Sequence, residues 1–229
     1  YAYGLAERGE LARAETLAKE SFNLFLAHGN RYERSGALGL LGRLALLRGD
    51  LEQARKLLSE AVTIATTVGY KDVQCNWQPL LGLVILYHGD MTAARQCLTE
   101  SLRLCIEVKA EHLLARNCTY LAETALCEGV LDEAAQWLAQ SVGYLANPDS
   151  ITTTELQRLW VAARLATAQQ QYQRAATLFG LADQAHSQIH DAIAGPMRSM
   201  ADAALATVQA ALELKVFAEA FVTGQQMGL

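Results

Sequence analysis

The sequence predicts an all-α solenoid, a right-handed superhelix of stacked antiparallel helix pairs with about 40 residues in each pair. The first observation behind this prediction is a short module that recurs along the chain. In it, a turn residue is followed by an apolar residue two positions later and by Ala five positions later. The turn residues are Gly9, Gly49, Gly89, Gly129 and Gln170, at steps of 40, 40, 40 and 41 residues. A fixed period in this range indicates a repeat array.

Composition is the second observation. The chain of 229 residues is 52% hydrophobic but only 7% aromatic and has 3 Pro, so Ala and Leu supply most of its apolar side chains. Both residues are strong helix formers. A repeat array grows in one dimension and needs no single large core. We therefore expect one continuous domain over residues 1–229.

Apolar residues at helical spacing on both sides of each turn predict the individual helices. In the second copy, Leu38, Leu41 and Ala45 share one face before the turn, and Ala54 and Leu58 share another after it. Neither helix can bury its apolar face alone, so each pair must stack on the next. The predicted repeats span residues 1–30, 31–70, 71–110, 111–149 and 150–191, followed by capping helices over 195–229.

Small residues and caps complete the repeat. A turn Gly supplies the left-handed backbone that ends the first helix of a pair, and Asp50 or Asp90 then caps the second helix. Small side chains recur where neighbouring backbones must approach closely. They are Gly42, Gly82 and Ala122 before the turn, and Ala54, Ala94, Ala134 and Ala175 after it.

Prolines mark the interruptions. Pro148 ends a helix, and Thr152 with Glu155 predicts a capping box for the next one. Pro196 lies near the first turn of another helix. Pro79 falls inside the first helix of the third copy, so we expect that helix to be kinked or to start late.

Charge and motif content exclude several classes of function. The net charge of −5, without a basic run, argues against nucleic-acid binding, and no apolar run is long enough to span a membrane. Five Cys without a C-x-x-C pair predict reduced thiols in a cytoplasmic protein. His186 and His190 share a helical face but lack a third metal ligand, and no catalytic constellation is evident. We expect no enzyme activity, no cofactor and no metal.

One face of the first helices does not repeat. It lies two positions before the packing face, and in a superhelix of this kind it lines the concave surface. Its arginines suit a carboxylate or phosphate, and its Trp adds a stacking platform. The predicted groove residues are Arg43, Asn76, Arg116, Glu123, Gln157, Trp160 and Arg164. We expect the groove to bind an acidic segment of a protein or peptide partner, or a small anionic effector. The alternatives are that this face is merely solvated, or that its arginines pair with carboxylates of neighbouring helices.

The module resembles the tetratricopeptide repeat, in which Leu-Gly, a turn Gly and two spaced Ala residues recur. The resemblance covers residues 1–190, although the tetratricopeptide unit has about 34 residues. The long unit, and "RAATLFGLADQAHSQIHDAI" followed by "ADAALATVQAALELKVFAEAFVTGQQMGL", are similar to the sensor arrays of bacterial MalT/LuxR-type signal-transducing ATPase regulators. Phe221 stands where that tail often has Trp. The resemblance implies the sensor or interaction region of a larger transcriptional regulator. The alternatives are a general tetratricopeptide scaffold that docks a partner peptide, and a helical enzyme or metal protein.

The N-terminal end predicts an interface. The chain enters the repeat a few residues before its first turn, which is too few for a complete first helix. Apolar side chains after that turn still need a cover, and they are Leu11, Leu17, Phe22 and Phe25. We therefore expect self-association through the N-terminal end.

Overall fold

The computed structural model describes residues 2–7, 10–144, 152–188 and 195–227, and every regular element in these ranges is a helix. The helices are α1 (Ala2–Glu7), α2 (Leu11–Ala27), α3 (Arg31–Leu47), α4 (Leu51–Val68), α5 (Lys71–Tyr87), α6 (Met91–Glu107), α7 (Glu111–Cys127), α8 (Leu131–Gly143), α9 (Thr153–Ala168), α10 (Tyr172–Gln188), α11 (Gly195–Ala211) and α12 (Leu214–Gln226).

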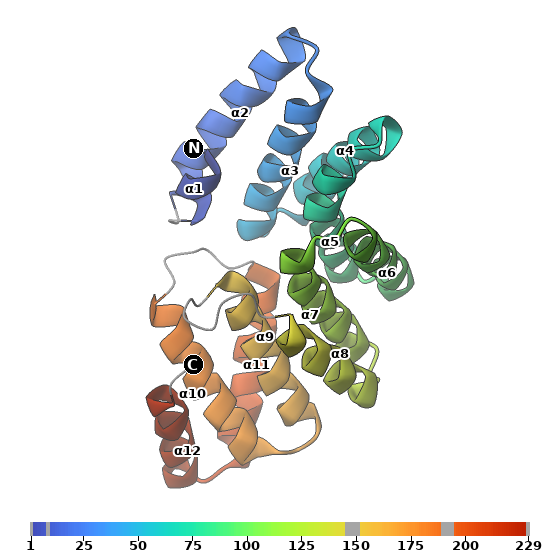
Figure 1. Cartoon of the computed structure of the whole chain (residues 1–229). Coiled ribbons are helices and arrows are strands. Elements are labelled where there is room, and N and C mark those ends of the chain that lie inside the picture. The colour runs from blue at the N-terminus through green and yellow to red at the C-terminus, as the bar shows by residue number, and fades with distance from the viewer. Residues whose placement is uncertain (1, 8–9, 145–151, 189–194, 228–229) are drawn as a thin grey trace.

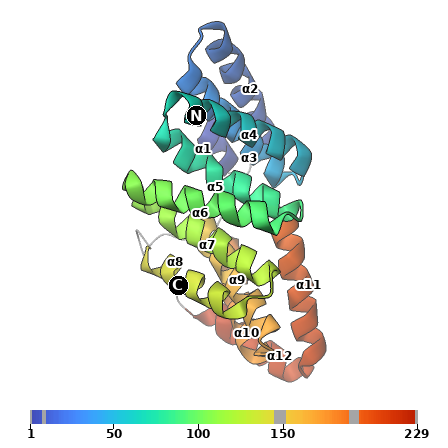
Figure 2. The same cartoon turned by 90° about the vertical axis from the view of Figure 1, so that its right-hand side faces the viewer.

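The helices form successive pairs, α3 with α4, α5 with α6, α7 with α8, and α9 with α10, and each pair packs on the next. The first helices of the pairs also contact one another in order, whereas α4, α6 and α8 lie along the outer edge of the curved array (Figure 1). The view turned by 90° shows the pairs stacked from the N-terminal to the C-terminal end (Figure 2). The predicted all-α solenoid is confirmed.

The turns between paired helices have the left-handed backbone that the recurring glycines predict. The angle φ is +80° at Gly49, +90° at Gly89 and +78° at Gly129. Gln170, the turn residue of the last copy, has the same conformation with φ of +59°. This conformation costs an L-residue roughly 1–2 kcal/mol. The repeat geometry therefore imposes the turn even where the sequence has lost its Gly.

Side-chain caps begin several helices. The Oδ1 atoms of Asp50 and Asp90 each accept a hydrogen bond from the backbone N–H three residues later, at 3.1 and 2.9 Å. The backbone N–H of Thr152 donates to Oε2 of Glu155 at 2.7 Å, which forms the predicted capping box. These bonds satisfy N–H groups that would otherwise lack a partner in the first turn of a helix.

Small residues let the two helices of a pair touch. A Cβ added to Gly42 would lie 2.7 Å from Cγ of Leu58, and one added to Gly82 would lie 2.7 Å from Cγ of Leu98, one repeat later. Each distance is well below a normal carbon–carbon contact of about 3.5–4.0 Å. The small residues after the turn are fully buried, and they are Ala54, Ala94, Ala134 and Ala175.

Pro79 lies inside α5, which begins at Lys71, so the helix does not start late. Proline has no backbone N–H and removes one hydrogen bond of the helix, but its position does not prevent the preceding two turns from forming. Two residues earlier, Trp77 packs directly against Gly39 of α3, where an added Cβ would overlap the indole ring. The interface between these repeats is therefore held by aromatic packing as well as by leucines.

The C-terminal helices depart from the geometry of a repeat. Helix α11 packs on α9 and α10, whereas α12 runs along α10 and barely contacts α11 (Figure 1). Two glycines make the crossing of α10 and α12 close. A Cβ added to Gly180 would overlap the backbone of Phe221, and one added to Gly224 would overlap the backbone of Thr177. The last pair is therefore splayed, which the repeat pattern did not predict.

The N-terminal end is covered only in part. Helix α1 packs on α2 and buries Leu5 and Ala6. The side chains of Leu24 and Leu26 on α2 remain 59% and 49% exposed. The four residues for which a cover was expected are half-buried, and they are Leu11, Leu17, Phe22 and Phe25. Self-association through this end stays a prediction.

Candidate functional site

The candidate site is the surface formed by the first helices α3, α5, α7 and α9 together with α11, which we call the inner surface. On it, the structure joins two of the predicted groove residues. Nη2 of Arg116 donates to the backbone carbonyl of Asn76 at 2.8 Å. Asn76 is exposed and Arg116 is half-buried, and Nε of Arg116 has no hydrogen-bond partner among the described residues. Arg43 on α3 is also half-buried.

Arg164 and Glu123 form a buried ion pair between α9 and α7. Nη1 of Arg164 lies 2.5 and 2.6 Å from the two carboxylate oxygens of Glu123. The Glu123 side chain is fully buried, and that of Arg164 is 11% exposed. Burial raises the pKa of the nearby Tyr87 hydroxyl, and the charge of Glu123 raises it further. One of the three predicted arginines is thus neutralised by a carboxylate of a neighbouring helix, as the alternative interpretation anticipated.

Gln157 and Trp160 are placed inside the array. Each is 7% exposed, and the Trp160 ring centroid lies 6.3 Å from that of His186 on α10. A small cavity of about 110 Å³ beside Trp160 is lined by residues of α9, α10, α11 and α12. With Glu123, these two residues do not lie on an open groove. The physical reason is that α10 and the capping helix α11 cover this part of α9, and the repeat period contains no information about where a capping helix packs.

The inner surface contains an open, shallow cavity of about 340 Å³ between α7, α9 and α11. Arg164 forms part of its wall, so the buried ion pair lies at the edge of the cavity. The other lining residues are Leu126, Thr167, Ala168, Ala203, Ala204 and Thr207. Because most of these side chains are small or apolar, the cavity suits an inserted side chain from another molecule. Sequence reasoning missed it because α11 supplies one wall.

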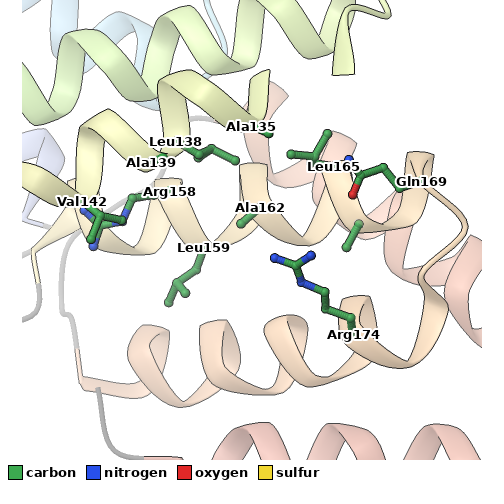
Figure 3. A pocket seen from close by; sticks show the side chains of 11 residues that line it. Ala135, Leu138, Ala139, Val142, Arg158, Leu159, Ala162, Leu165, Gln169 and Arg174 are labelled. Atoms are coloured by element: carbon green, nitrogen blue, oxygen red, sulfur yellow. The ribbon is translucent and has the colours of Figure 1, made fainter. Parts of the chain in front are cut away.

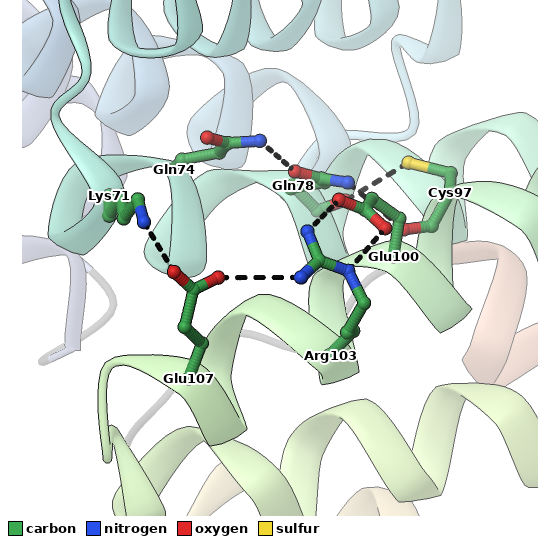
Figure 4. A network of polar contacts seen from close by, with 7 residues as sticks. All are labelled: Lys71, Gln74, Gln78, Cys97, Glu100, Arg103 and Glu107. Atoms are coloured by element: carbon green, nitrogen blue, oxygen red, sulfur yellow. Dashed lines mark hydrogen bonds and ion pairs between the residues drawn. The ribbon is translucent and has the colours of Figure 1, made fainter.

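A network of ion pairs whose charges cancel joins α5 and α6 (Figure 4). Nζ of Lys71 lies 2.5 Å from Glu107, and Arg103 binds Glu100 at 2.7 Å and Glu107 at 3.4 Å. Arg103 lowers the pKa of Glu100, and Lys71 lowers the pKa of Glu107. The two positive and two negative charges neutralise one another, so this network has no excess charge to attract a ligand.

Among the described residues, the side chains that could hold a metal ion are scattered, and the thiols are buried or half-buried. In this part of the chain, no three His, Cys, Asp or Glu side chains are grouped so that they could hold a metal ion. His190, one half of the predicted histidine pair, lies outside the described residues. All five cysteines are free, and burial raises the pKa of Cys97 and of Cys118 to about 11. Both thiols are therefore protonated near neutral pH and are poor nucleophiles. None of the described helices has the length and apolar character needed to cross a membrane.

Comparison with known proteins identifies the fold. No protein-family model and no curated protein matches the chain. BtubC (BKLC) from P. vanneervenii is similar in structure, with a TM-score of 0.60 and 17% identity over 94% of this chain and 87% of that chain. A Podosopora anserina protein named for kinesin light chain, whose TPR-like repeats are nearly identical to one another, is also similar in structure. Its TM-score is 0.56, with 18% identity over 82% of this chain and 92% of that chain. A variant of the same repeats has a TM-score of 0.57. The chain therefore has a fold of TPR-like helical repeats.

Proposed function

We propose that this chain is a non-catalytic helical-repeat module that binds a protein partner on its inner surface through a peptide segment with acidic side chains. A small anionic effector is the second candidate occupant of the same surface. The proposal treats residues 1–229 as one repeat domain of a cytoplasmic protein, without a cofactor or a metal.

The cavity between α7, α9 and α11 is the observation that supports this proposal most. Three consecutive inner helices form its walls, so an inserted side chain would contact three structural units at once. Farther along the inner surface, Arg116 holds a guanidinium whose Nε has no hydrogen-bond partner among the described residues. Guanidinium groups pair well with carboxylates, so an acidic segment can pair with the exposed part of this half-buried guanidinium while a neighbouring side chain fills the cavity.

We further propose that the module belongs to a larger bacterial transcriptional regulator or signal-transducing ATPase, where ligand binding releases autoinhibition. This proposal rests on the similarity of the C-terminal segments. Gly180 of the "LFG" segment and Gly224 of the tail are the two glycines that bring α10 and α12 into contact. The alternative is a general scaffold that docks a partner peptide in a multiprotein complex. A Walker loop encoded in the full-length reading frame would favour the regulator, and its absence would favour the scaffold.

The test is capture of a partner by matched variants. The chain is immobilised, exposed to a lysate of its source cells and washed at low and high salt. We expect the wild type to retain a specific protein, with less retained at high salt because exposed charges are screened within about 8 Å at physiological ionic strength. Thr207→Glu places a carboxylate in the cavity and should abolish retention.

Gln209→Glu is the matched control, because residues two apart on a helix face different directions. It adds the same charge to the same helix outside the cavity and should retain the partner. Equal retention by the two variants would show that the partner does not use the inner cavity. The same pair of variants, measured by thermal shift against small anions, tests the second candidate occupant.

A further inference from the structure

Another cavity lies between α8, α9 and α10, on a different part of the array (Figure 3). Its volume is about 360 Å³, at the small end of the range of roughly 300–1,000 Å³ found for small-molecule sites. Leu138 and Val142 of α8 and Leu159, Ala162 and Leu165 of α9 give it an apolar wall. It shares no lining residue with the cavity of the inner surface.

A departure from the repeat creates this space. The positions equivalent to Ala162 in the three preceding repeats are Leu41, Leu81 and Leu121, with the same one-residue shift that separates the last two turn residues. Leu121 is fully buried, Leu41 is 8% exposed and Leu81 is half-buried, so in the preceding repeats the leucine packs in the interface between helices. Helix α8 is also shorter, with 13 residues against 17 in α6. The missing side chain and the short helix together leave the gap.

Two arginines that are absent from the preceding repeat line the cavity. Arg158 and Arg174 stand where the previous copy has Asn117 and Glu133. Nη1 of Arg158 is buried and has no hydrogen-bond partner among the described residues, and burial lowers the pKa of this guanidinium. Figure 3 shows the guanidinium of Arg174 extending from α10 toward α9. None of the described residues that line the cavity is acidic.

The buried Nη1 of Arg158 lacks an acceptor among the described residues, which is unfavourable, and an anion that enters the cavity would supply one. We infer that the cavity between α8, α9 and α10 binds a small organic carboxylate with an apolar body. The carboxylate accepts a hydrogen bond from Nη1 of Arg158. The exposed Arg174, whose Nη1 donates to Gln171 at 2.9 Å, adds positive charge at the cavity, and the apolar body covers the wall around Leu138 and Ala162. This site is separate from the inner surface, so the inference goes beyond the proposed function and does not depend on it.

Isothermal titration calorimetry with octanoate tests the inference. Octan-1-ol, which has the apolar body without the charge, and acetate, which has the charge without the body, are the ligand controls. The protein variants are Arg158→Met, which removes the charge but keeps an apolar chain, and Ala162→Leu, which restores the side chain of the preceding repeats. Arg55→Met removes an exposed arginine of α4 and is the matched control.

We expect saturable binding of octanoate to the wild type and to Arg55→Met, at least tenfold weaker binding of octan-1-ol and acetate, and a similar loss in Arg158→Met. Ala162→Leu should bind no octanoate while its circular dichroism stays helical and its melting temperature is retained or raised. Undiminished binding by Ala162→Leu, equal binding of octanoate and octan-1-ol, or no saturable heat with the wild type would each overturn the site. Thr207→Glu should bind octanoate like the wild type, so the outcome is independent of partner binding on the inner surface.

Discussion

Several side-chain hydrogen bonds and ion pairs join residues that lie one repeat apart. Tyr32 donates its hydroxyl to Asp72 at 2.6 Å, and Arg116 contacts the backbone of Asn76. Glu123 and Arg164 pair in the same way, with the extra residue of the last step between them. Because first helices stack in register, a side chain at one position faces the same position in the next repeat. Polar residues 40 or 41 positions apart on first helices are therefore the sequence signal that finds these contacts.

The buried ion pair of Glu123 and Arg164 should contribute strongly to the stability of the fold. Glu123→Gln leaves the Arg164 charge buried without its counter-ion, and we expect the free energy of unfolding to fall by about 3–5 kcal/mol. The matched control is Glu100→Gln, which breaks an exposed pair with Arg103 and should change it by less than about 1 kcal/mol. Urea denaturation followed by circular dichroism measures both. A loss of equal size in the two variants would show that burial of the first pair has no energetic consequence.

The candidate site was only partly predictable from single residues. Glycine turns, aspartate caps and buried alanines follow from the repeat because each is required by local backbone geometry or by close packing. The groove residues do not follow from the repeat. The predicted groove residues lie on a helix face that varies between copies, but variation does not distinguish a solvated side chain from one that a neighbouring helix covers. Gln157 and Trp160 vary and are nevertheless buried.

At the scale of elements, the crossing of α10 and α12 is the contact that a periodic pattern cannot contain. A repeat predicts how equivalent pairs pack, and α4–α5 or α6–α7 follow that rule. The end of an array has no following pair, so α12 packs back along α10 and α11 closes the face of α9. Gly180 and Gly224 make this arrangement sterically allowed. A helical segment that contains an isolated Gly was the available signal for a close crossing.

Gly224→Ala should therefore loosen the C-terminal end. Its Cβ would overlap the carbonyl of Thr177, and we expect a loss of about 1–3 kcal/mol, together with faster proteolysis of α12. The control is Gly36→Ala in α3, where an added Cβ meets no atom within 4 Å. That change should stabilise by up to about 1 kcal/mol because Ala favours helix over Gly. If Gly224→Ala were as stable as the wild type, the close crossing would not exist in solution.

At the scale of the whole molecule, half-buried and exposed carboxylates that pair with basic residues link stability to pH. The pKa values of Glu15, Glu107 and Glu133 are lowered by Arg48, Lys71 and Arg95 respectively. A carboxylate whose pKa is lower in the folded state contributes stability above its ordinary pKa of about 4.3 and loses that contribution as the pH falls through its folded value. The fold should therefore weaken on acidification.

We expect the melting temperature to be nearly constant from about pH 7 to pH 5 and to fall below about pH 4.5. Arg95→Met removes the partner of Glu133 and should make the fall shallower, whereas Arg55→Met should leave it unchanged. Differential scanning calorimetry across this range measures the effect. A melting temperature that rose on acidification would contradict the sign of the pKa shifts.

The exposed end of α2 leads to a prediction about assembly. We expect concentration-dependent self-association in sedimentation velocity, because Leu24 and Leu26 are each exposed near the end of α2. The double change Leu24→Glu, Leu26→Glu should suppress it. Leu214→Glu, at a residue that is 84% exposed at the other end of the array, should not. A wild type that stays monomeric at high protein concentration would contradict the predicted N-terminal interface.

The central claim is that the chain is a binding module whose partner occupies the inner surface. The most direct measurement places the photo-crosslinking residue benzoylphenylalanine at Thr207, inside the cavity, or at Gln209, on a different face of α11, in the full-length protein in its own cells. We predict a crosslinked partner from Thr207 and none from Gln209. Crosslinks from Gln209 alone, or equal crosslinking from both positions, would contradict the claim.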